Sequence, residues 1–381
     1  MKHLFTLLAL TIGFSMNAQT PIYPWFAGTV TTAIQTASNT ASGEYSTAMG
    51  YETKANGNSS TAMGESTTAS GTYSTAMGKS TEASGDNSTA MGYGTTASRQ
   101  GSTAMGRSTK ANGYASTAMG ESTTANGESS TAMGNDTKAS GTYSTAMGYE
   151  TKANGESSTA MGRNTTASGE YSTAMGRNTT AYGDYSTAMG RSTTASDFGS
   201  LVIGQYNSSG STPTSADSFN TANTAFVIGN GTVDVAKDAF KVMFNGDTTV
   251  SNDLTVNGNV MVSSDARLKA NIVSLGATLA KLLLIDGKSY TMKKDGKQKI
   301  GVLAQDIQKV FPELVSTDDR DMLAVNYQGL VPVLINALKE QDAKMKEQDA
   351  KMKEQQADID ELKEQEKRLE RLEAIISKMD K

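Results

Sequence analysis

The chain has 381 residues, 34 of them basic and 39 acidic, and only 6% of them are aromatic. It has no cysteine, which excludes disulfides and thiolate chemistry. Because no basic stripe appears along the sequence, nucleic acid is not expected as a partner. Gly, Ser, Thr and Ala dominate the first half, and such a composition fills no ordinary globular core, so this part must be either disordered or periodic.

Residues 1–18 have the pattern of a signal peptide. A basic start at Lys2 precedes the apolar run 4–14, and small residues lead to a plausible cut before Gln19. The run is too short for a transmembrane helix, which needs ~18 apolar residues or more, and a buried N-terminal helix is the alternative. Removing this segment also removes His3, the only histidine, and so excludes catalysis by Ser-His-Asp or Cys-His and ordinary zinc sites. We expect no cofactor, no metal and no transmembrane segment in the mature chain.

Residues 19–36 are interpreted as an N-terminal cap, and residues 37–204 repeat every fourteen residues. Each repeat reads roughly x-x-Thr-x-Ala-x-Gly-x-x-Ser-Thr-Ala-Met-Gly, in two halves of seven. One glycine marks the end of each copy: Gly50, Gly64, Gly78, Gly92, Gly106, Gly120, Gly134, Gly148, Gly162, Gly176, Gly190 and, in a degenerate copy, Gly204. Such a period predicts a solenoid whose coils stack at ~4.8 Å, or a rod on the order of 55 Å long for about twelve coils.

Side chains in each repeat divide between two faces, because they alternate along an extended strand. Ser46, Ala48 and Gly50 share one face, which suits a narrow interior, and Thr47 and Met49 share the other. A strand with small or apolar residues on both faces requires burial on both, so we expect a partner chain to cover the Thr and Met face. Charged and bulky variable residues are expected in the turns: Glu44, Tyr45, Tyr51, Glu52 and Lys54.

Two other interpretations of the repeats are weaker. A disordered low-complexity linker has no reason to keep methionine at one phase of the period. A threonine-rich ice-binding solenoid needs a flat Thr-x-Thr array, which the variable turn residues interrupt. The Ser-x-Ala-x-Gly rhythm instead resembles the head repeats of trimeric autotransporter adhesins.

That resemblance implies a mainly β fold, with a left-handed parallel β-roll packed as a homotrimer. It also implies a bacterial protein that is secreted or held at the cell surface, with a host or matrix glycan or protein as ligand. Those adhesins end in a membrane-anchoring β-barrel segment, whereas this sequence ends in a charged helical pattern, so self-anchoring is not predicted.

Residues 205–262 predict a β neck. Segments 225–231 and 239–247 have the composition of strands that end in Asn-Gly or Gly-Asp turns, and short apolar segments at 249–250, 254–256 and 259–262 continue the pattern. We expect an intertwined neck with its phenylalanines in the core. The alternative is that these rings line a small ligand site.

Residues 263–330 carry several motifs in order. They are Ser-Asp-Ala-Arg-Leu-Lys at 264–269, Ile-Gly-Val-Leu-Ala-Gln at 300–305 and Val-Asn-Tyr-Gln-Gly-Leu at 325–330. Together these motifs resemble the intramolecular chaperone domain of phage endosialidases and tail spikes, the peptidase S74 family. The resemblance implies a small α+β domain that trimerises, helps the preceding fibre to assemble and then cleaves itself off.

By position, the resemblance makes Ser264 the nucleophile and Lys269 the general base, with cleavage between Ser263 and Ser264; Asp265 and Arg267 match the motif without an assigned role. The pairing is chemically reasonable, because Ser-Lys pairs recur in hydrolases. A basic lysine must be neutral, and its reference pKa is ~10.4, so desolvation or nearby positive charge has to lower it. A trimer interface would do so only after assembly. The alternative is a trimerisation domain that does not cleave.

Residues 331–381 predict a coiled coil. The apolar seam is Leu334, Leu338, Met345, Met352, Ile359 and Leu362, with Gln341, Gln348 and Gln355 at the alternate core positions. The seam shifts phase near Gln365, and a single solvated helix is the alternative.

Two function classes follow from this organisation. The favoured one is a structural or adhesive surface fibre whose C-terminal domain is its assembly chaperone, with single-turnover self-cleavage as its only enzymatic activity. The other is a fibre that binds or degrades an external glycan, but the repeats offer no acidic cluster for such chemistry. A phage-tail-fibre-like protein is a further alternative, against which the signal peptide argues.

Overall fold

The computed structural model describes residues 26–27, 34–35, 38–210, 212–317 and 321–379. They fall into two compact units, residues 1–258 and 259–381. The predicted signal peptide, 1–18, and most of the predicted cap, 19–36, lie outside the described residues. The chain is mainly β, as predicted, with a parallel solenoid in the first unit and a long helix at the end of the second.

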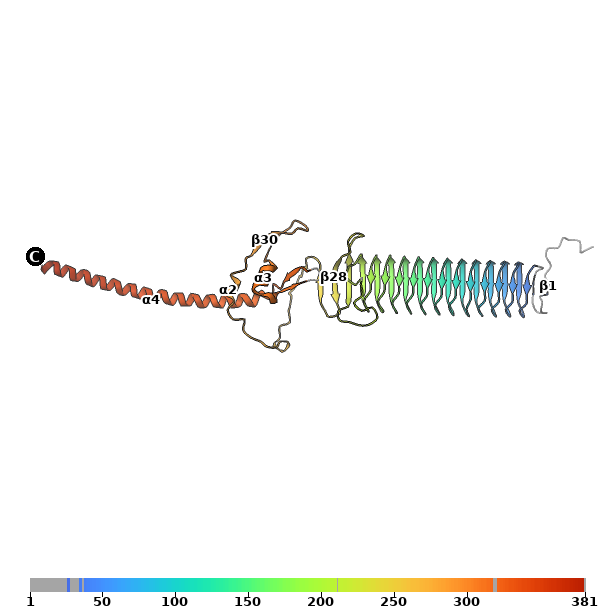
Figure 1. Ribbon diagram of the computed structural model, residues 1–381, viewed down its shortest axis with the longest axis horizontal. Helices are drawn as coiled ribbons and strands as arrows, with labels where there is room; N and C mark the ends of the chain where they lie inside the picture. Colours follow the sequence, from blue (N-terminus) through green and yellow to red (C-terminus); the bar gives the residue numbers. More distant parts are fainter. Residues whose placement is uncertain (1–25, 28–33, 36–37, 211, 318–320, 380–381) are drawn as a thin grey trace, which may run out of the picture. The chain divides into compact units, whose positions relative to one another are not determined.

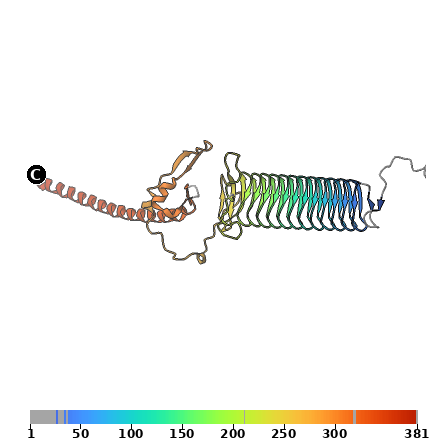
Figure 2. The same cartoon turned by 45° about the vertical axis from the view of Figure 1, so that its right-hand side comes forward.

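The first unit is a stack of two-stranded coils, each with one longer and one shorter strand (Figures 1 and 2). The longer strands are β4 (Thr47–Tyr51), β6 (Thr61–Glu65), β8 (Thr75–Lys79), β10 (Thr89–Tyr93), β12 (Thr103–Arg107), β14 (Thr117–Glu121), β16 (Thr131–Asn135), β18 (Thr145–Tyr149), β20 (Thr159–Arg163), β22 (Thr173–Arg177), β24 (Thr187–Arg191) and β26 (Leu201–Gln205). The shorter strands are β3 (Thr40–Ala41), β5 (Lys54–Ala55), β7 (Thr68–Ala69), β9 (Glu82–Ala83), β11 (Thr96–Ala97), β13 (Lys110–Ala111), β15 (Thr124–Ala125), β17 (Lys138–Ala139), β19 (Lys152–Ala153), β21 (Thr166–Ala167), β23 (Thr180–Ala181) and β25 (Thr194–Ala195).

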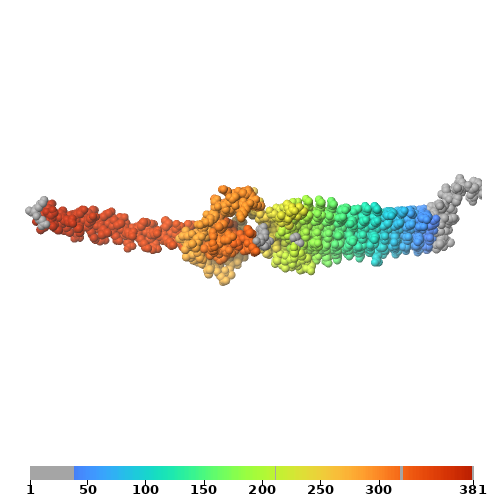
Figure 3. Space-filling view, turned by 45° about the horizontal axis from the view of Figure 1, so that its top comes forward, coloured from blue at the N-terminus to red at the C-terminus, as the bar shows by residue number. Residues whose placement is uncertain are grey.

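Every coil pairs in parallel and in register with the next, so each residue lies beside its copy fourteen residues later. Ala90, for example, pairs with Ala104, and Met91 with Met105. Figure 3 shows the stacked coils as one continuous column. At the N-terminal end β2 (Ile34–Gln35) pairs in parallel with β4, and β1 (Phe26–Ala27) pairs antiparallel with β2. The predicted fourteen-residue solenoid is confirmed.

The predicted inner and outer faces are correct except at Gly50, which was predicted on the inner face but is exposed, because its positive φ breaks the alternation of the strand. Ser46 and Ala48 are buried in the coil interior, whereas Thr47 and Met49 are half-exposed on the outer face of the longer sheet. The prediction that all variable residues lie in turns was wrong for two of them, because Tyr51 ends β4 and Lys54 begins β5. Both of these long variable side chains are exposed at strand ends.

The interior is narrow and contains a column of threonines from the side of the shorter strands. Their hydroxyl groups are buried and, within the described residues, have no hydrogen-bond partner: Thr53, Thr67, Thr81, Thr95, Thr109, Thr123, Thr137, Thr151, Thr165, Thr179 and Thr193. Several serines on the other side are satisfied locally; Ser116 Oγ, for example, donates to the Gly113 carbonyl at 2.8 Å. We call the first set the threonine column.

The glycine at the fourth position of each longer strand is required by the conformation of the backbone there. Gly120 has a φ of +117°, and a Cβ on it would lie 2.0 Å from the carbonyl oxygen of Gly134 in the next coil. Only glycine adopts this conformation without strain, and only a residue without a side chain lets the coils approach so closely.

Asparagines replace threonine at both ends of the threonine column. At the first coil, the Thr53 N–H donates to Asn39 Oδ1 at 2.7 Å, and Asn39 Nδ2 donates to the Gly50 carbonyl at 2.8 Å. At the last coil, the Thr194 N–H donates to Asn207 Oδ1 at 2.8 Å, and Asn207 Nδ2 donates to the Thr194 carbonyl at 2.9 Å. An amide has both a donor and an acceptor, so it satisfies a strand edge that has no further coil.

The neck begins as an extension of the solenoid. β27 (Thr224–Asn230) pairs in parallel with β26, and β28 (Asp238–Met243) and β29 (Thr248–Val250) follow in antiparallel order. Phe226 and Phe240 are half-buried, with ring centroids 6.0 Å apart, as expected for packing residues. The predicted strands at 254–256 and 259–262 are absent, and their side chains are exposed in the single chain, where they have no strand to pair with.

The second unit is a small α+β domain followed by a long helix (Figure 1). Its elements are η1 (Ala266–Leu268), α2 (Leu279–Leu282), β30 (Lys288–Thr291), β31 (Gln298–Gly301), α3 (Ala304–Val310), η2 (Pro312–Leu314), β32 (Val315–Thr317), β33 (Leu323–Val325) and α4 (Leu330–Met379). The strands form two antiparallel hairpins, β30–β31 and β32–β33. Ile307, Phe311 and Val333 form the buried core, so the first turns of α4 belong to the domain.

Beyond Ala337, α4 buries none of its described residues. Its predicted seam is solvent-exposed in the single chain: Met345 is 56% exposed and Leu362 is 63% exposed. An apolar stripe at heptad spacing along a helix of 50 residues is the pattern that a coiled coil buries between its helices. Across the described residues, no helix has the length and apolarity needed to cross a membrane.

Candidate self-cleavage site

A single 3₁₀ turn brings the two predicted catalytic side chains together. Ser264 lies just before η1 and Lys269 caps its C-terminus, where the Lys269 N–H donates to the Ala266 carbonyl at 3.1 Å. This turn folds the chain back over five residues, and Lys269 Nζ donates to Ser264 Oγ at 2.6 Å. The distance is within hydrogen-bonding range for a nucleophile and its base.

Asp265 and Arg267 hold the turn that positions this pair. Asp265 Oδ1 accepts a hydrogen bond from the Arg267 backbone N–H at 2.8 Å, which caps η1. The guanidinium also donates to both carboxylate oxygens, from Nε at 3.1 Å and from Nη2 at 2.7 Å. The side-chain bond from Arg267, followed by its backbone bond, lowers the pKa of the Asp265 carboxyl. The two residues that had no predicted role therefore act on the backbone between Ser264 and Lys269.

Both Ser264 and Lys269 are exposed in the single chain. A lysine acts as a base only when it is neutral, and burial or neighbouring positive charge favours that form. The single chain provides the contact between nucleophile and base, but not the enclosure that the chemistry requires. Their catalytic roles therefore remain predictions.

One contact in this unit was not predicted from the sequence. The Glu340 carboxylate on α4 accepts hydrogen bonds from the backbone N–H groups of Thr278 and Leu279 at the start of α2, and Thr278 Oγ1 donates to the Val333 carbonyl at 3.1 Å. The backbone bond from Thr278 is the largest cause that lowers the pKa of Glu340. Glu340 opens a heptad that recurs verbatim from Glu347, so the sequence gave no sign that the first copy has a separate role.

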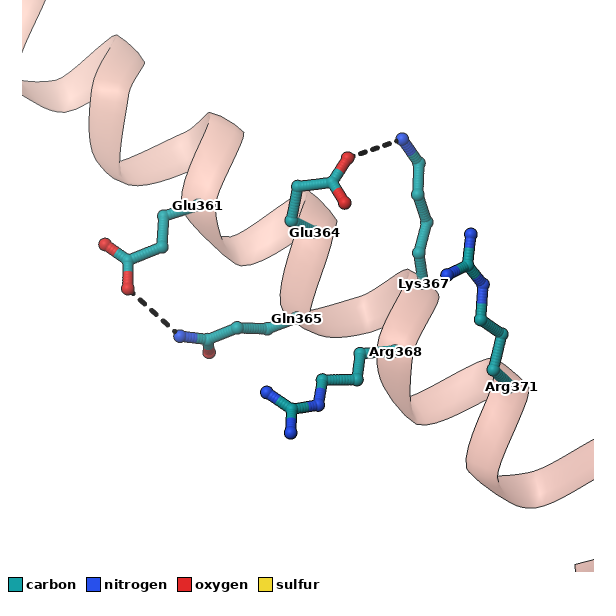
Figure 4. Close-up of a pocket in the computed structure, with 6 residues that line it drawn as sticks. All are labelled: Glu361, Glu364, Gln365, Lys367, Arg368 and Arg371. Atoms are coloured by element: carbon teal, nitrogen blue, oxygen red, sulfur yellow. Dashed lines mark hydrogen bonds and ion pairs between the residues drawn. The ribbon is translucent and has the colours of Figure 1, made fainter. Parts of the chain in front are cut away.

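The described part of the surface also has open hollows away from this site. Figure 4 shows one along α4, where all six lining residues come from the same helix. Lys367 Nζ pairs with Glu364 at 2.9 Å, and Gln365 Nε2 donates to Glu361 at 3.3 Å. These are ordinary contacts of a solvated helix surface, with no enclosed space for a substrate.

Comparisons with known proteins match both units. The family described as Chaperone of endosialidase matches residues 264–316, so the match begins at Ser264. The YadA head domain repeat matches in eight ranges between residues 37 and 206.

A relative among characterised proteins is the Long tail fiber protein Gp37 of Escherichia phage AR1, which is 34% identical over 92 residues. The match covers 22% of this chain and 8% of the phage protein, so the chain spans only a small part of that relative. The chain is therefore similar to YadA head repeats over its solenoid and to the endosialidase chaperone family over the start of its second unit, as the sequence resemblance predicted.

Proposed function

We propose that the protein is an exported homotrimeric fibre that acts as an adhesive or structural element at the bacterial surface. In this proposal, the C-terminal domain drives trimer assembly and then cleaves itself off between Ser263 and Ser264. The head repeats and the chaperone match both support an extracellular or surface fibre.

The observation that carries the proposal is the unpartnered seam of α4. Its apolar side chains are exposed in the single chain over most of the 50-residue helix and recur at heptad spacing, which supports a coiled coil over the alternative of a single solvated helix. The first unit has a second such surface, because the methionines of the longer sheet are only half-buried along the whole solenoid. Association of copies would cover both surfaces at once, and the exposed segment 254–262 would gain strand partners.

Self-cleavage is proposed from the contact between Ser264 Oγ and Lys269 Nζ. In its neutral form Lys269 takes the hydroxyl proton, and the Ser264 oxygen attacks the carbonyl carbon of Ser263 through a five-membered ring. The C–N bond between Ser263 and Ser264 then breaks, and the nitrogen receives the proton to become the new N-terminus. Water hydrolyses the resulting ester, which frees the Ser263 carboxylate and restores the Ser264 hydroxyl. Because the step requires a desolvated lysine, it would follow assembly.

Intact-mass measurement and light scattering of the secreted protein test both parts of the proposal. We expect a trimer whose head ends at Ser263, and a separate fragment that begins at Ser264. Ser264→Ala and Lys269→Ala should each leave the chain intact, whereas the control Ser274→Ala, at another exposed serine of this unit, should be cleaved normally. A monomer would refute trimer assembly. Intact wild-type chains, with both variants unchanged in mass, would refute self-cleavage alone.

The similarity to the phage long tail fibre protein supports a second candidate, a fibre of a phage-like particle. Cell fractionation separates the two candidates. A surface fibre is recovered with the outer surface or the medium of cells that contain no particles, whereas a tail fibre co-purifies with particles. An array of glycans and matrix proteins then tests adhesion, and binding to neither would leave a structural role.

A further inference from the structure

We propose that the last coils of the solenoid carry a binding site for a linear anionic polysaccharide, formed by Arg163, Arg177 and Arg191. The proposal rests on the proposed surface fibre and names the class of ligand that the fibre binds. We call these three residues the arginine row.

The fold brings the row together from residues fourteen positions apart. Arg163, Arg177 and Arg191 are the last residues of β20, β22 and β24, and the parallel register pairs each directly with the next. Neighbouring strands lie ~4.8 Å apart, so three guanidinium groups are spread over about 10 Å. No basic stripe appears in the linear sequence because the period separates these residues, although the same register position is basic in three consecutive repeats.

The same column is neutralised in earlier coils. Lys79 pairs with Glu65 at 3.0 Å, and Arg107 pairs with Glu121 at 3.2 Å, in each case between adjacent strands. In the arginine row the sign of the charge does not alternate. Within the described residues, none of the three arginines has an acidic partner, and all three are exposed in the single chain. Three adjacent like charges repel one another, so an anionic ligand would relieve a cost that the earlier coils avoid.

An aromatic ring lies at each end of the row. The Arg163 guanidinium lies 5.4 Å from the centroid of the Tyr149 ring, and that of Arg191 lies 5.5 Å from the Tyr206 ring. These cation–π contacts hold the outer arginines, whereas Arg177 has neither a ring nor a carboxylate among its described neighbours. The row is therefore partly ordered before a ligand binds, which lowers the entropy lost on binding.

Charge is segregated between the two edges of these coils. Beside the arginine row, the next turn presents the neutral residues Asn164, Asn178 and Ser192. The acidic residues of the same coils are Glu156, Glu170 and Asp184, which lie in the turns before the longer strands, at the opposite edge. A polyanion that follows the fibre axis along the three coils of the arginine row meets no carboxylate at this edge, and the first carboxylate beyond them is Glu150, beside Tyr149 in the preceding coil.

Sulfated or carboxylated polysaccharide fits this surface best. Guanidinium groups bind sulfate and carboxylate in bidentate geometry. Nucleic acid is less suited, because it needs a longer basic surface and the chain as a whole carries a net charge of −5.

Binding of heparin, dextran sulfate, neutral dextran and duplex DNA to the full secreted protein tests the proposal. We compare the wild type with Arg163→Gln/Arg177→Gln/Arg191→Gln, and with the control Lys54→Gln/Lys79→Gln/Arg107→Gln, which loses the same charge from scattered positions. Each exposed charged contact contributes roughly a two- to fivefold change in affinity, so the triple variant should bind sulfated polysaccharide roughly eight- to 125-fold more weakly. The control should remain within about threefold of wild type, and binding should weaken as salt rises.

Equal losses in the two triple variants would show a general charge effect and overturn the site. Unchanged binding by the Arg→Gln variant, or no binding of sulfated polysaccharide by the wild type, would overturn it too. Tighter binding of DNA than of either sulfated polymer would overturn the ligand class. An Arg163→Lys/Arg177→Lys/Arg191→Lys variant keeps the charge, and intermediate affinity would support bidentate recognition. The mass and oligomeric state of the same samples test the proposed fibre independently.

Discussion

Replacing threonines of the threonine column by valine should stabilise the solenoid, although each replacement removes a hydroxyl group that could form a hydrogen bond. The column has eleven such threonines among the described residues. The informative variant changes three adjacent positions in the middle of the array, Thr109→Val/Thr123→Val/Thr137→Val. All three hydroxyls are buried without a partner among the described residues. Valine has nearly the same shape and a higher preference for strands, so the coil need not repack.

The size of the effect follows from what each hydroxyl loses on folding. A buried hydroxyl without a partner costs ~1–3 kcal/mol, of which we count ~1 kcal/mol per site because the narrow interior allows some relaxation. The triple variant should therefore gain ~3 kcal/mol. For a unit of this size, ~1 kcal/mol raises Tm by about 2–4 °C, so the expected shift is about 6–12 °C.

Thermal unfolding followed by circular dichroism measures this shift, at one fixed protein concentration because association affects Tm. The matched control is Ser116→Ala, which removes a hydroxyl that donates to the Gly113 carbonyl and should lower stability by ~0.5–1.5 kcal/mol. A loss of stability in the valine variant as large as that in the control would refute the reasoning. It would mean that the threonine hydroxyls are satisfied in solution, for example by a file of internal water.

Three further predictions concern the glycines of the longer strands, the end of the solenoid at Asn207, and the contact between Glu340 and α2. Gly120→Ala should lower the free energy of unfolding by at least ~3 kcal/mol, because it adds strain at positive φ and a clash with the Gly134 carbonyl. The control Gly258→Ala, where a Cβ meets open space, should change the melting curve little. Equal effects of the two variants would contradict this explanation. Asn207→Ala should cost ~1–3 kcal/mol and speed amide hydrogen exchange at Thr194, and unchanged exchange there would argue against capping. The folded pKa of Glu340 is lowered, so its contribution is present above the unfolded value of ~4.3 and is lost as pH falls through the folded pKa. Glu340→Gln should therefore weaken the C-terminal unit at pH 7 in urea titrations, and its difference from wild type should shrink as the pH falls below ~4.3. A difference that is constant across pH would refute the role of the Glu340 contact with α2.

The periodic part of the fold was predictable because one residue type recurs at each structural position. The inward and outward faces of Ala48 and Met49 follow from alternation alone, and stacking repeats the same choice in every coil. The pairing of Ser264 with Lys269 was predicted from a resemblance, and the local turn that joins them depends on Asp265 and Arg267, which offered no independent signal.

Features that depend on a break in the period were harder to predict. Asn39 and Asn207 look like ordinary substitutions in the array, and their role is seen only from their hydrogen bonds at the two ends of the shorter sheet. The arginine row is visible only after the chain is folded into coils. The segment at 254–262 is the reverse case, in which strands were predicted but not found. Its sequence has a strand-like pattern, but the single chain offers it no neighbouring strand to pair with.

The in-register stacking also has a consequence for how the gene can vary. Neighbouring repeats are nearly identical in sequence, so unequal recombination within the array would add or delete whole units of fourteen residues. Each unit gained or lost would change the length of the solenoid by ~4.8 Å. The amide caps at Asn39 and Asn207 stand outside the exchanged units, so the ends would survive such changes intact. The solenoid could therefore become longer or shorter by whole coils across generations, while the structure of each coil and of the two ends stays the same.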